Sequence, residues 1–363
     1  MRSSTRRIAM RAAVVAAASA VALVGCSSAG DSGGGGGATT ASGSAAASGY
    51  MVAAKDGPYL VGFSNSFAGN AFRTQMILEM QEYANGSDMV KDMIVTDANN
   101  SVDKQLSDIN DLLTKNIDIL LINAASETAL NEAVQRAWEQ GVIVVSFDNQ
   151  VSSEHGIIVN TDQKEFGRIG GEWLAGKLKE GDKIFTLDGL AGSPVSDARL
   201  AGATEVLKAA GIEIVAGGAT DWDQAKGQSV TSDLLAANPD VAGIYSQGGG
   251  PSLGAINAMQ QRGDTIIPIS GEGYNGFLKK WVELRDSIGF ESIAPSNPPY
   301  LGAIALDFAI KALQGEDPGQ SPAVELPVIT QDNLDDNVRP DLPDAFFLPT
   351  RLSEETIKAN YGQ

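Results

Sequence analysis

The sequence predicts an α/β fold with parallel sheets, arranged as two similar lobes. Short runs rich in valine and isoleucine alternate with longer segments of helical period along the chain. One run, 117–122, is apolar at almost every position, which is typical of a strand buried on both faces of a sheet. After residue 148 the alternation starts again and fills a second stretch. Two consecutive sets of alternating elements favour two lobes of the same kind.

The first set of elements begins and ends with an apolar run. Gly141 stands just after the last helical segment of this set, where glycine readily takes the left-handed conformation that ends a helix. The predicted strands are 59–64, 93–96, 117–123 and 142–148, and the predicted helices are 72–84, 102–115 and 127–140.

The second set begins with a helical segment and continues the alternation. Gly211 directly follows one of its helices, where glycine is a suitable C-cap. The predicted helices are 166–179, 195–210, 224–237, 253–262, 274–284 and 300–313, and the predicted strands are 183–187, 212–215, 241–246, 265–270 and 287–294.

The N-terminal residues are typical of an export signal. A basic stretch precedes an apolar run, 12–24, that is too short to cross a bilayer. The run ends in Leu23-Val24-Gly25-Cys26, which resembles the lipobox of bacterial lipoproteins and implies cleavage before Cys26 and lipid attachment to its sulfur. Cys26 is the only cysteine of the chain, so no disulfide competes for it. The alternative is an ordinary signal peptide with a chance cysteine.

The predicted signal peptide, 1–25, is followed by a predicted flexible tether, 26–57. Up to Gly49 this tether is almost entirely serine, glycine, alanine and threonine, which cannot bury enough apolar surface to fold. The formal charge of the whole chain is −19, and its acids are spread out rather than clustered. A chain this acidic should repel nucleic acid and anionic lipid, so neither is expected as a partner.

Polar and aromatic side chains follow the predicted strands at their carboxyl ends, where open α/β sheets bind ligands. Asn123 and Asp148 follow strands of the first set, and Gln247 and Glu272 follow strands of the second. Amides and charged groups can satisfy the hydroxyls of a neutral polyol, and an aromatic ring can cover the apolar face of a sugar. Histidine and cysteine are missing from these positions, so no catalytic residue, metal ligand or cofactor is predicted.

Several motifs in this order and spacing resemble one family. The strings are Ile122-Asn123-Ala124, the run 144–149 (Val-Val-Ser-Phe-Asp-Asn), Asp221-Trp222-Asp223 and Asn238-Pro239-Asp240-Val241. With them the chain, from about 58 to 314, resembles periplasmic sugar-binding proteins of the ribose- and galactose-binding type, which share their core with the lactose-repressor family. The resemblance implies Rossmann-like lobes of the type I periplasmic binding protein fold, joined by three hinge crossovers. The expected lobes are 58–160 plus about 297–326, and 161–296 plus about 327–363.

The resemblance also implies a ligand-binding role for each matched residue. Phe72 and Trp222 would cover the two faces of one sugar ring, while Asp148 and Arg199 would hold its hydroxyls. All of these groups are expected to face the cleft, so that their removal would barely change folding. The implied ligand-binding residues are Asn70, Phe72, Arg73, Asn123, Asp148, Asn149, Arg199, Trp222, Gln247, Glu272 and Asn297.

Some positions depart from the family pattern. Asn149 stands where the ribose-binding protein has an arginine, and Glu272 stands where an aspartate is usual. Asn297, with Ser296 as the other candidate, replaces the hinge-side glutamine. Glycines at 248–250 replace a polar Asn-Asp-Glu-like string, which removes side-chain contacts and opens space. These glycines do not form a phosphate loop, because no Lys-Ser or Lys-Thr follows them.

Each assignment has a structural alternative. Phe72 could pack in the core with Met76 and Met80, and Arg199 could form a surface ion pair. Asn123 could be a turn-forming residue, Asp148 could cap its loop, Glu272 could be solvated, and Trp222 could be buried by default.

The sequence therefore predicts a monomeric, lipid-anchored, extracytoplasmic binding protein that delivers a monosaccharide, pentose or hexose, to an ABC permease. The alternative ligand is a nucleoside, polyol or signalling furanosyl compound, or the protein is the ligand-binding partner of a sensor. An enzyme such as a glycosidase with paired carboxylates is the less favoured class. A DNA-binding regulator is excluded by the lipobox and the negative charge.

Overall fold

The computed structural model describes residues 48–362. The predicted signal peptide, Cys26 and most of the predicted tether lie outside the described residues. The first sheet is entirely parallel and has the strand order β2-β1-β3-β4-β5. Its strands are β1 (Tyr59–Asn65), β2 (Val90–Asp97), β3 (Ile119–Asn123), β4 (Ile143–Phe147) and β5 (Ile157–Val159).

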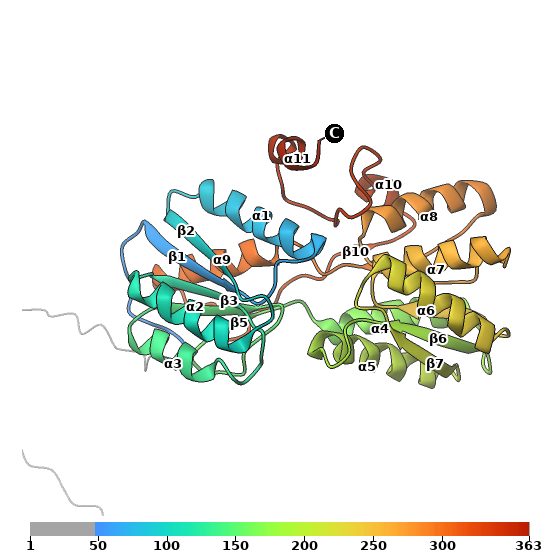
Figure 1. Cartoon of the computed structure of the whole chain (residues 1–363), viewed down its shortest axis with the longest axis horizontal. Helices are drawn as coiled ribbons and strands as arrows, with labels where there is room; N and C mark the ends of the chain where they lie inside the picture. Colours follow the sequence, from blue (N-terminus) through green and yellow to red (C-terminus); the bar gives the residue numbers. More distant parts are fainter. Residues whose placement is uncertain (1–47, 363) are drawn as a thin grey trace, which may run out of the picture. The chain divides into compact units, whose positions relative to one another are not determined.

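Helices cover both faces of the first sheet, as Figure 1 shows. They are α1 (Ala71–Asn85), α2 (Val102–Thr114), α3 (Asn131–Glu139) and α9 (Leu301–Leu313). One hydrophobic core joins α1 and α9 to one face, and another joins α2 and α3 to the other. Both β3 and β4 are buried at every residue, which explains why these runs are apolar throughout. We call this sheet with its helices the first lobe.

The second sheet is also parallel, with the strand order β7-β6-β8. Its strands are β6 (Lys183–Asp188), β7 (Glu213–Ala219) and β8 (Gly243–Ser246). It packs with α4 (Gln163–Ala175), α5 (Pro194–Ala209), α6 (Gln224–Ala237), α7 (Gly249–Arg262) and α8 (Asn275–Ile288). Two hydrophobic cores again lie on its two sides, one of them containing α4 and α5 residues. We call this sheet with its helices the second lobe.

Two predicted strands of the second set are wrong. Residues 265–270 form only an isolated bridge between Ile269 and Ile244, not a strand. The run 287–294 is divided, because α8 continues to Ile288 and ends at Gly289, whose φ is +72°. Only its last residue joins a strand, β9 (Ala294–Pro295), which pairs with β10 (Val328–Ile329) in a short antiparallel sheet.

The chain passes between the two lobes after β5, after β9 and before β10. The first passage leads from β5 into α4, and the second leads from β9 into α9. After β10, the core of the second lobe takes in buried C-terminal residues such as Leu334, Phe346 and Ile357. This C-terminal part carries two short helices that the sequence did not predict, α10 (Leu334–Asn337) and α11 (Glu354–Tyr361).

The end of the predicted tether belongs to the folded body. Tyr50 is buried in the first-lobe core and its hydroxyl donates a hydrogen bond to Asp317 at 2.9 Å. The Trp138 indole N–H donates to the Met51 carbonyl at 2.9 Å. The boundary at residue 57 is therefore wrong, because an aromatic side chain and a strong backbone contact fix the chain from about Tyr50. Between residues 48 and 362, none of the helices has the length and apolar character needed to cross a bilayer.

Candidate functional site

Two adjoining cavities lie between the lobes, at the carboxyl ends of their parallel strands. We call the smaller one, of about 130 Å³, the inner pocket. We call the larger one, of about 570 Å³, the outer compartment. The inner pocket is lined by Asn70, Phe72, Arg73, Asp148, Asn149, Leu190, Ser193, Val195, Arg199, Trp222, Gly248, Gly249, Gly250, Glu272, Asn297 and Phe347. Most of the predicted site residues are thus brought into one place.

The first-lobe side of the inner pocket is built on the first turn of α1. Asn70 is the N-cap of this helix, and its Oδ1 accepts a hydrogen bond from the Arg73 backbone N–H at 2.8 Å. Its side-chain amide nitrogen makes no hydrogen bond to the described residues. The cap fixes where the helix starts, and so places Phe72 and Arg73 beyond the carboxyl end of β1. Phe72 is half-buried rather than a core residue, although it also packs beside the first-lobe core.

Arg73 and Asp148 form an ion pair inside this pocket, with 2.5 Å between Nη2 and Oδ2. Both residues are buried. Asn297 donates to Asp148 Oδ1 at 2.9 Å, so Asp148 also bonds to the passage between the lobes. Burial alone would raise the pKa of Asp148, but the Arg73 guanidinium and amide donors outweigh it, so this pKa lies below its ordinary value. The lowered pKa favours the ionised carboxylate of Asp148, which can accept hydrogen bonds.

Backbone strain marks the same residue. Asp148 has a φ of +57°, a left-handed conformation that residues other than glycine seldom adopt. Asp221 and Trp222, on the other side of the pocket, have φ values of +53° and +57°. Such conformations persist where the surrounding structure fixes them, and they cluster at ligand sites.

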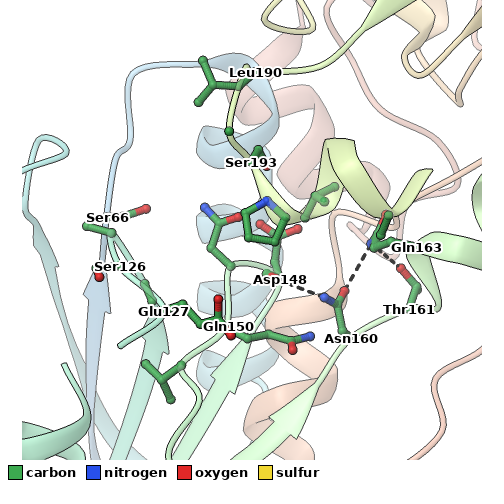
Figure 2. Close-up of a pocket in the computed structure, with 18 of the residues that line it drawn as sticks. Ser66, Ser126, Glu127, Asp148, Gln150, Asn160, Thr161, Gln163, Leu190 and Ser193 are labelled. Carbon is green, nitrogen blue, oxygen red and sulfur yellow. Dashed lines mark hydrogen bonds between the residues drawn. The ribbon is translucent and has the colours of Figure 1, made fainter. Parts of the chain in front are cut away.

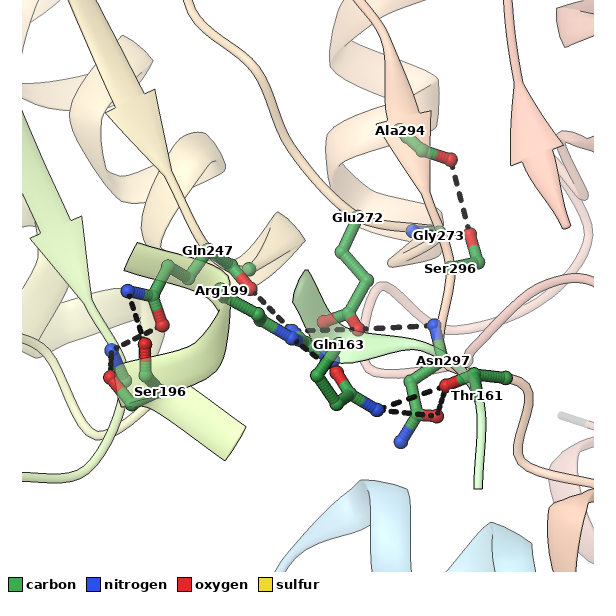
Figure 3. Close-up of polar contacts among 12 residues, drawn as sticks. Thr161, Gln163, Ser196, Arg199, Gln247, Glu272, Gly273, Ala294, Ser296 and Asn297 are labelled. Atoms are coloured by element: carbon green, nitrogen blue, oxygen red, sulfur yellow. Dashed lines mark hydrogen bonds and ion pairs between the residues drawn. The ribbon is translucent and has the colours of Figure 1, made fainter. Parts of the chain in front are cut away.

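The second-lobe side of the pocket carries a second buried ion pair, between Arg199 and Glu272. Arg199 Nη1 lies 3.3 Å from Glu272 Oε1 and donates to the Gln247 carbonyl at 2.7 Å. Its Nε donates to Gln163 Oε1 at 2.8 Å, and its guanidinium carbon lies 3.7 Å from the centre of the Phe166 ring. Figure 3 shows this network continuing through Gln163 to Asn297. The ion pair that Arg199 forms is thus buried and does not lie on the surface.

Each member of this pair has one polar atom without a hydrogen-bond partner among the described residues. Among residues 48–362, no acceptor bonds Arg199 Nη2 and no donor bonds Glu272 Oε2. Burial raises the pKa of Glu272 above its ordinary value, and Arg199 offsets only part of that rise. The pocket therefore places the Arg199 guanidinium, a cationic donor, next to the Glu272 carboxyl group, whose pKa is raised.

Trp222 fills space that two glycines leave open. A Cβ at Gly248 would lie 2.9 Å from Cδ1 of the indole, and a Cβ at Gly189 would overlap its six-membered ring. The glycines at 248–250 therefore do not simply enlarge the pocket, because the indole takes part of the space that they free. The indole N–H is buried and has no hydrogen-bond partner among the described residues.

Two predicted ligand contacts lie behind the pocket instead of lining it. Asn123 is fully buried and donates to Asp148 Oδ2 at 3.1 Å. Gln247 is fully buried and its side chain bonds to Asp188, Gly189 and Ser196. Both were predicted because they end strands, but a strand end can support a neighbouring residue as well as contact a ligand. They hold Asp148 and Arg199 in place.

Phe347 lines the pocket but was not predicted from the sequence, and the same holds for Leu190, Ser193 and Val195. The Phe347 ring meets Phe72 edge-on with 5.1 Å between ring centres, and it meets Tyr274 in the same way at 5.4 Å. In the sequence the residue lies in the C-terminal part, well after the last strand, β10. The adjacent pair Phe346-Phe347 was the available signal, with one ring in the core and the next one half-buried.

The outer compartment is a continuation of the inner pocket. It shares Asp148, Asn149 and Ser193 with the inner pocket and is further lined by Glu127 and Gln150. Figure 2 shows Glu127, Asp148, Gln150 and Ser193 around the cavity, with Leu190 at its edge. Leu190 is 51% exposed, which is unusual for a leucine beside a cavity. A ligand larger than one ring would extend here.

The arrangement suits the binding of a neutral polyol. It combines aromatic rings with ionised and amide groups that are already held by other protein groups. No group of three histidine, cysteine or carboxylate side chains within residues 48–362 is placed to hold a metal ion.

Comparison with known proteins agrees with the fold and with sugar binding. The model of the periplasmic binding protein domain family matches residues 61–317. The ribose import binding protein RbsB of Escherichia coli is 30% identical over 225 residues, which cover 62% of this chain and 75% of that protein. RbsB of Bacillus subtilis is 28% identical over 276 residues, covering 75% and 88%. An ABC transporter solute-binding protein of Mycobacterium smegmatis with bound glycerol has a TM-score of 0.68 and 24% identity, covering 80% of this chain and 99% of that one.

Proposed function

Because this chain belongs to the periplasmic binding protein domain family, we propose that it is the sugar-binding subunit of an ABC importer. It binds a monosaccharide, a pentose or a hexose, in the inner pocket and delivers it to the permease. It acts as a monomer and carries no catalytic activity. The names of its relatives support a sugar as the ligand, since they include ribose and allose import proteins.

The observation that carries this proposal is the placement of two buried ion pairs around a small cavity with aromatic walls. Arg73–Asp148 comes from the first lobe and Arg199–Glu272 from the second. A sugar hydroxyl both donates and accepts, so it can bond to either member of such a pair. Phe72 and Trp222 supply apolar surface for the C–H faces of the ring.

Ligand binding is proposed to close the two lobes on each other. The binding groups are divided between the lobes, so a bound sugar favours the conformation that brings both sets into contact. The proposed lobe boundaries are those expected from the sequence except at the N-terminal end, which moves from 58 to about 50: 50–160 with 297–326, and 161–296 with 327–363. We further propose that the exported chain is held at the outer face of the cell membrane by lipid on Cys26.

A second ligand class is favoured by the outer compartment. A cavity of about 570 Å³ next to the ring-sized pocket provides room for a substituent on the sugar. A nucleoside or another furanosyl compound would place its ring in the inner pocket and its substituent beside Asn149 and Gln150.

Calorimetric titration of the purified protein tests the proposal. The panel is D-ribose, D-allose, D-galactose, xylitol, myo-inositol and adenosine, each also titrated into the Trp222→Ala variant. We expect one sugar to bind the wild type and to lose at least tenfold in affinity with Trp222→Ala, because the indole covers the ring. Tight binding of adenosine without binding of D-ribose would favour the second class. Binding of none of the panel would refute both.

A further inference from the structure

The C-terminal residues 345–353, here called the strap, are bonded to both lobes. In Figure 1 they run from the region of α10 to α11, close to α1. On the second-lobe side, the Leu348 N–H donates to the Gly273 carbonyl at 2.6 Å, and the Asn275 N–H donates to the Phe346 carbonyl at 2.8 Å. Phe346 and Leu348 are buried in the second-lobe core. This side of the strap is therefore part of the second lobe.

The other side of the strap is bonded to side chains of α1, in the first lobe. Gln75 holds the Phe347 backbone at both ends, accepting from its N–H at 2.8 Å and donating to its carbonyl at 2.9 Å. Glu79 accepts from Thr350 Oγ1 at 2.6 Å and from the Arg351 N–H at 3.0 Å. Glu82 accepts from the Ser353 N–H at 3.0 Å.

These first-lobe contacts are costly to break. Gln75 is fully buried and Glu79 is only 3% exposed. Separation of the strap from α1 would leave buried polar groups without partners unless water replaced the strap. The contacts follow one another along a single helix face, at spacings of three and four residues.

Between its two attachments, the strap places Phe347 in the inner pocket. The ring lies edge-on between Phe72 of the first lobe and Tyr274 of the second. One residue thus contacts both lobes and the cavity, while Gln75 fixes its backbone.

We propose that Phe347 is a ligand-contacting residue and that the strap links ligand binding to the attachment of α1. Opening of the pocket moves α1 away from the second lobe, so it loosens the bonds from Gln75, Glu79 and Glu82. A ligand that packs against Phe347 favours the attached strap, and by reciprocity an attached strap favours the ligand. Gln75 acts as a positioning residue. This inference rests on the proposed function for its ligand and goes beyond it in assigning a role to the C-terminal residues.

The binding test compares two phenylalanine variants of the full chain. D-ribose, D-allose and xylitol are titrated by calorimetry into the wild type, Phe347→Ala and Phe308→Ala. Phe308 is half-buried beside the first-lobe core, away from the pocket. For the sugar that binds the wild type, we expect Phe347→Ala to weaken affinity at least tenfold and Phe308→Ala to leave it within about twofold. Equal affinities of wild type and Phe347→Ala would overturn the assignment.

The coupling test follows hydrogen exchange of the Arg351 and Ser353 amides, whose acceptors are Glu79 and Glu82 and not Gln75. We expect the bound sugar to slow exchange at both amides in the wild type but not in Gln75→Met. Loss of a purely structural contact would lower overall stability without removing this difference. No effect of sugar on these amides in the wild type would overturn the coupling.

A sugar-free arm separates this inference from the proposed function. Without ligand, Gln75→Met should speed exchange at Arg351 and Ser353. The matched variant Gln105→Met also loses a fully buried glutamine that bonds to backbone, but on α2, and should not speed it. Equal hydrogen exchange at Arg351 and Ser353 in the two variants would show that the residues of the strap do not detach from α1 together. Failure of the wild type to bind any of the three sugars would count against both the ligand role of Phe347 and the proposed function. The sugar-free arm would still decide whether the strap moves as one unit.

Discussion

The Arg73 guanidinium and the Asp148 carboxylate are joined at 2.5 Å, although they come from different elements of the first lobe, 75 residues apart in sequence. Asp148 also bonds to Asn297 in the passage between the lobes. This carboxylate therefore connects the ligand pocket, the first lobe and the passage. From the sequence alone, alanine at Asp148 or Arg199 was expected to leave folding almost unchanged. The buried pairs change that expectation for both residues.

The Asp148→Asn substitution should lower both stability and affinity. It leaves the buried Arg73 charge without its partner, which typically costs about 3–5 kcal/mol in the free energy of unfolding. Binding of the sugar identified by titration should weaken about tenfold to a hundredfold. Urea unfolding and calorimetry measure the two effects. The control is Asp264→Asn, which breaks an exposed pair with Arg262 and should cost at most about 1 kcal/mol. Native stability of Asp148→Asn would contradict the role given to the pair.

The Gly248→Ala substitution should weaken sugar binding by displacing the Trp222 indole. Its Cβ would lie 2.9 Å from the ring, which is too close for a carbon–carbon contact. Overpacking of this kind typically costs about 1–3 kcal/mol, so we expect an affinity loss of about tenfold by calorimetry. Gly156→Ala is the matched control, since its Cβ would meet only ordinary contacts of 3.8 Å and more. If both variants bind equally well, the indole is not held by the glycine.

The titration of Glu272 should make the free energy of unfolding depend on pH. Its pKa is raised in the folded protein above the ordinary value of 4.5, chiefly by burial. Between the two values the folded state binds more protons than the unfolded state, so the free energy of unfolding falls as pH rises through this window.

We expect Glu272→Gln to remove this part of the slope in urea unfolding measured from pH 4.5 to neutral pH. The exposed Glu283→Gln variant should keep the slope of the wild type. Parallel curves for wild type and Glu272→Gln would show that Glu272 does not titrate in this way.

The Cys26→Ser substitution tests the proposed anchor. A lipidated Cys26 would hold the protein at a membrane, because two acyl chains give durable anchoring. We expect the serine variant to be found in the soluble fraction or to keep its signal peptide, as seen by fractionation and mass spectrometry. Ser27→Ala is the neighbouring control and should fractionate like the wild type. Unchanged fractionation and processing of Cys26→Ser would refute the lipoprotein assignment.

The protein should bind its sugar without converting it. The Asp148 and Glu272 carboxyl groups that face the pocket are each held in an ion pair, which suits hydrogen bonding. We expect D-ribose and D-allose to be recovered unchanged after long incubation, as judged by NMR. Aryl glycosides should release no phenol above the rate seen with heat-denatured protein. Steady release would support a glycosidase instead.

The sequence predicted the strands and helices well where burial is uniform. The runs that became β3 and β4 lie between two helical layers, so their apolar pattern was unambiguous. The run 287–294 misled because Ile288 ends α8 and is 62% exposed, whereas Phe290 packs in the second-lobe core instead of entering a sheet. Hydrophobic period alone does not separate these cases.

Predicted site residues line the inner pocket where they follow a predicted strand and point into the cavity, as Asp148 and Glu272 do. The sequence could not tell Asn123 from Asp148, because both stand at strand ends and the left-handed backbone of Asp148 is not evident from the sequence. The pair Phe346-Phe347 could not by itself place Phe347 in the pocket, since its backbone is held by Gln75, which lies 272 residues away in the sequence.

The fit between Trp222 and Gly248 has a consequence for how this pocket can change during evolution. A larger side chain at 248 and the indole at 222 compete for one volume, so neither position can vary freely while the other stays fixed. Among homologous sequences, glycine at 248 should therefore accompany tryptophan at 222, and a polar side chain at 248 should accompany a smaller aromatic ring. A change of ligand preference along this lineage would require the two substitutions together, and single-step intermediates would bind poorly.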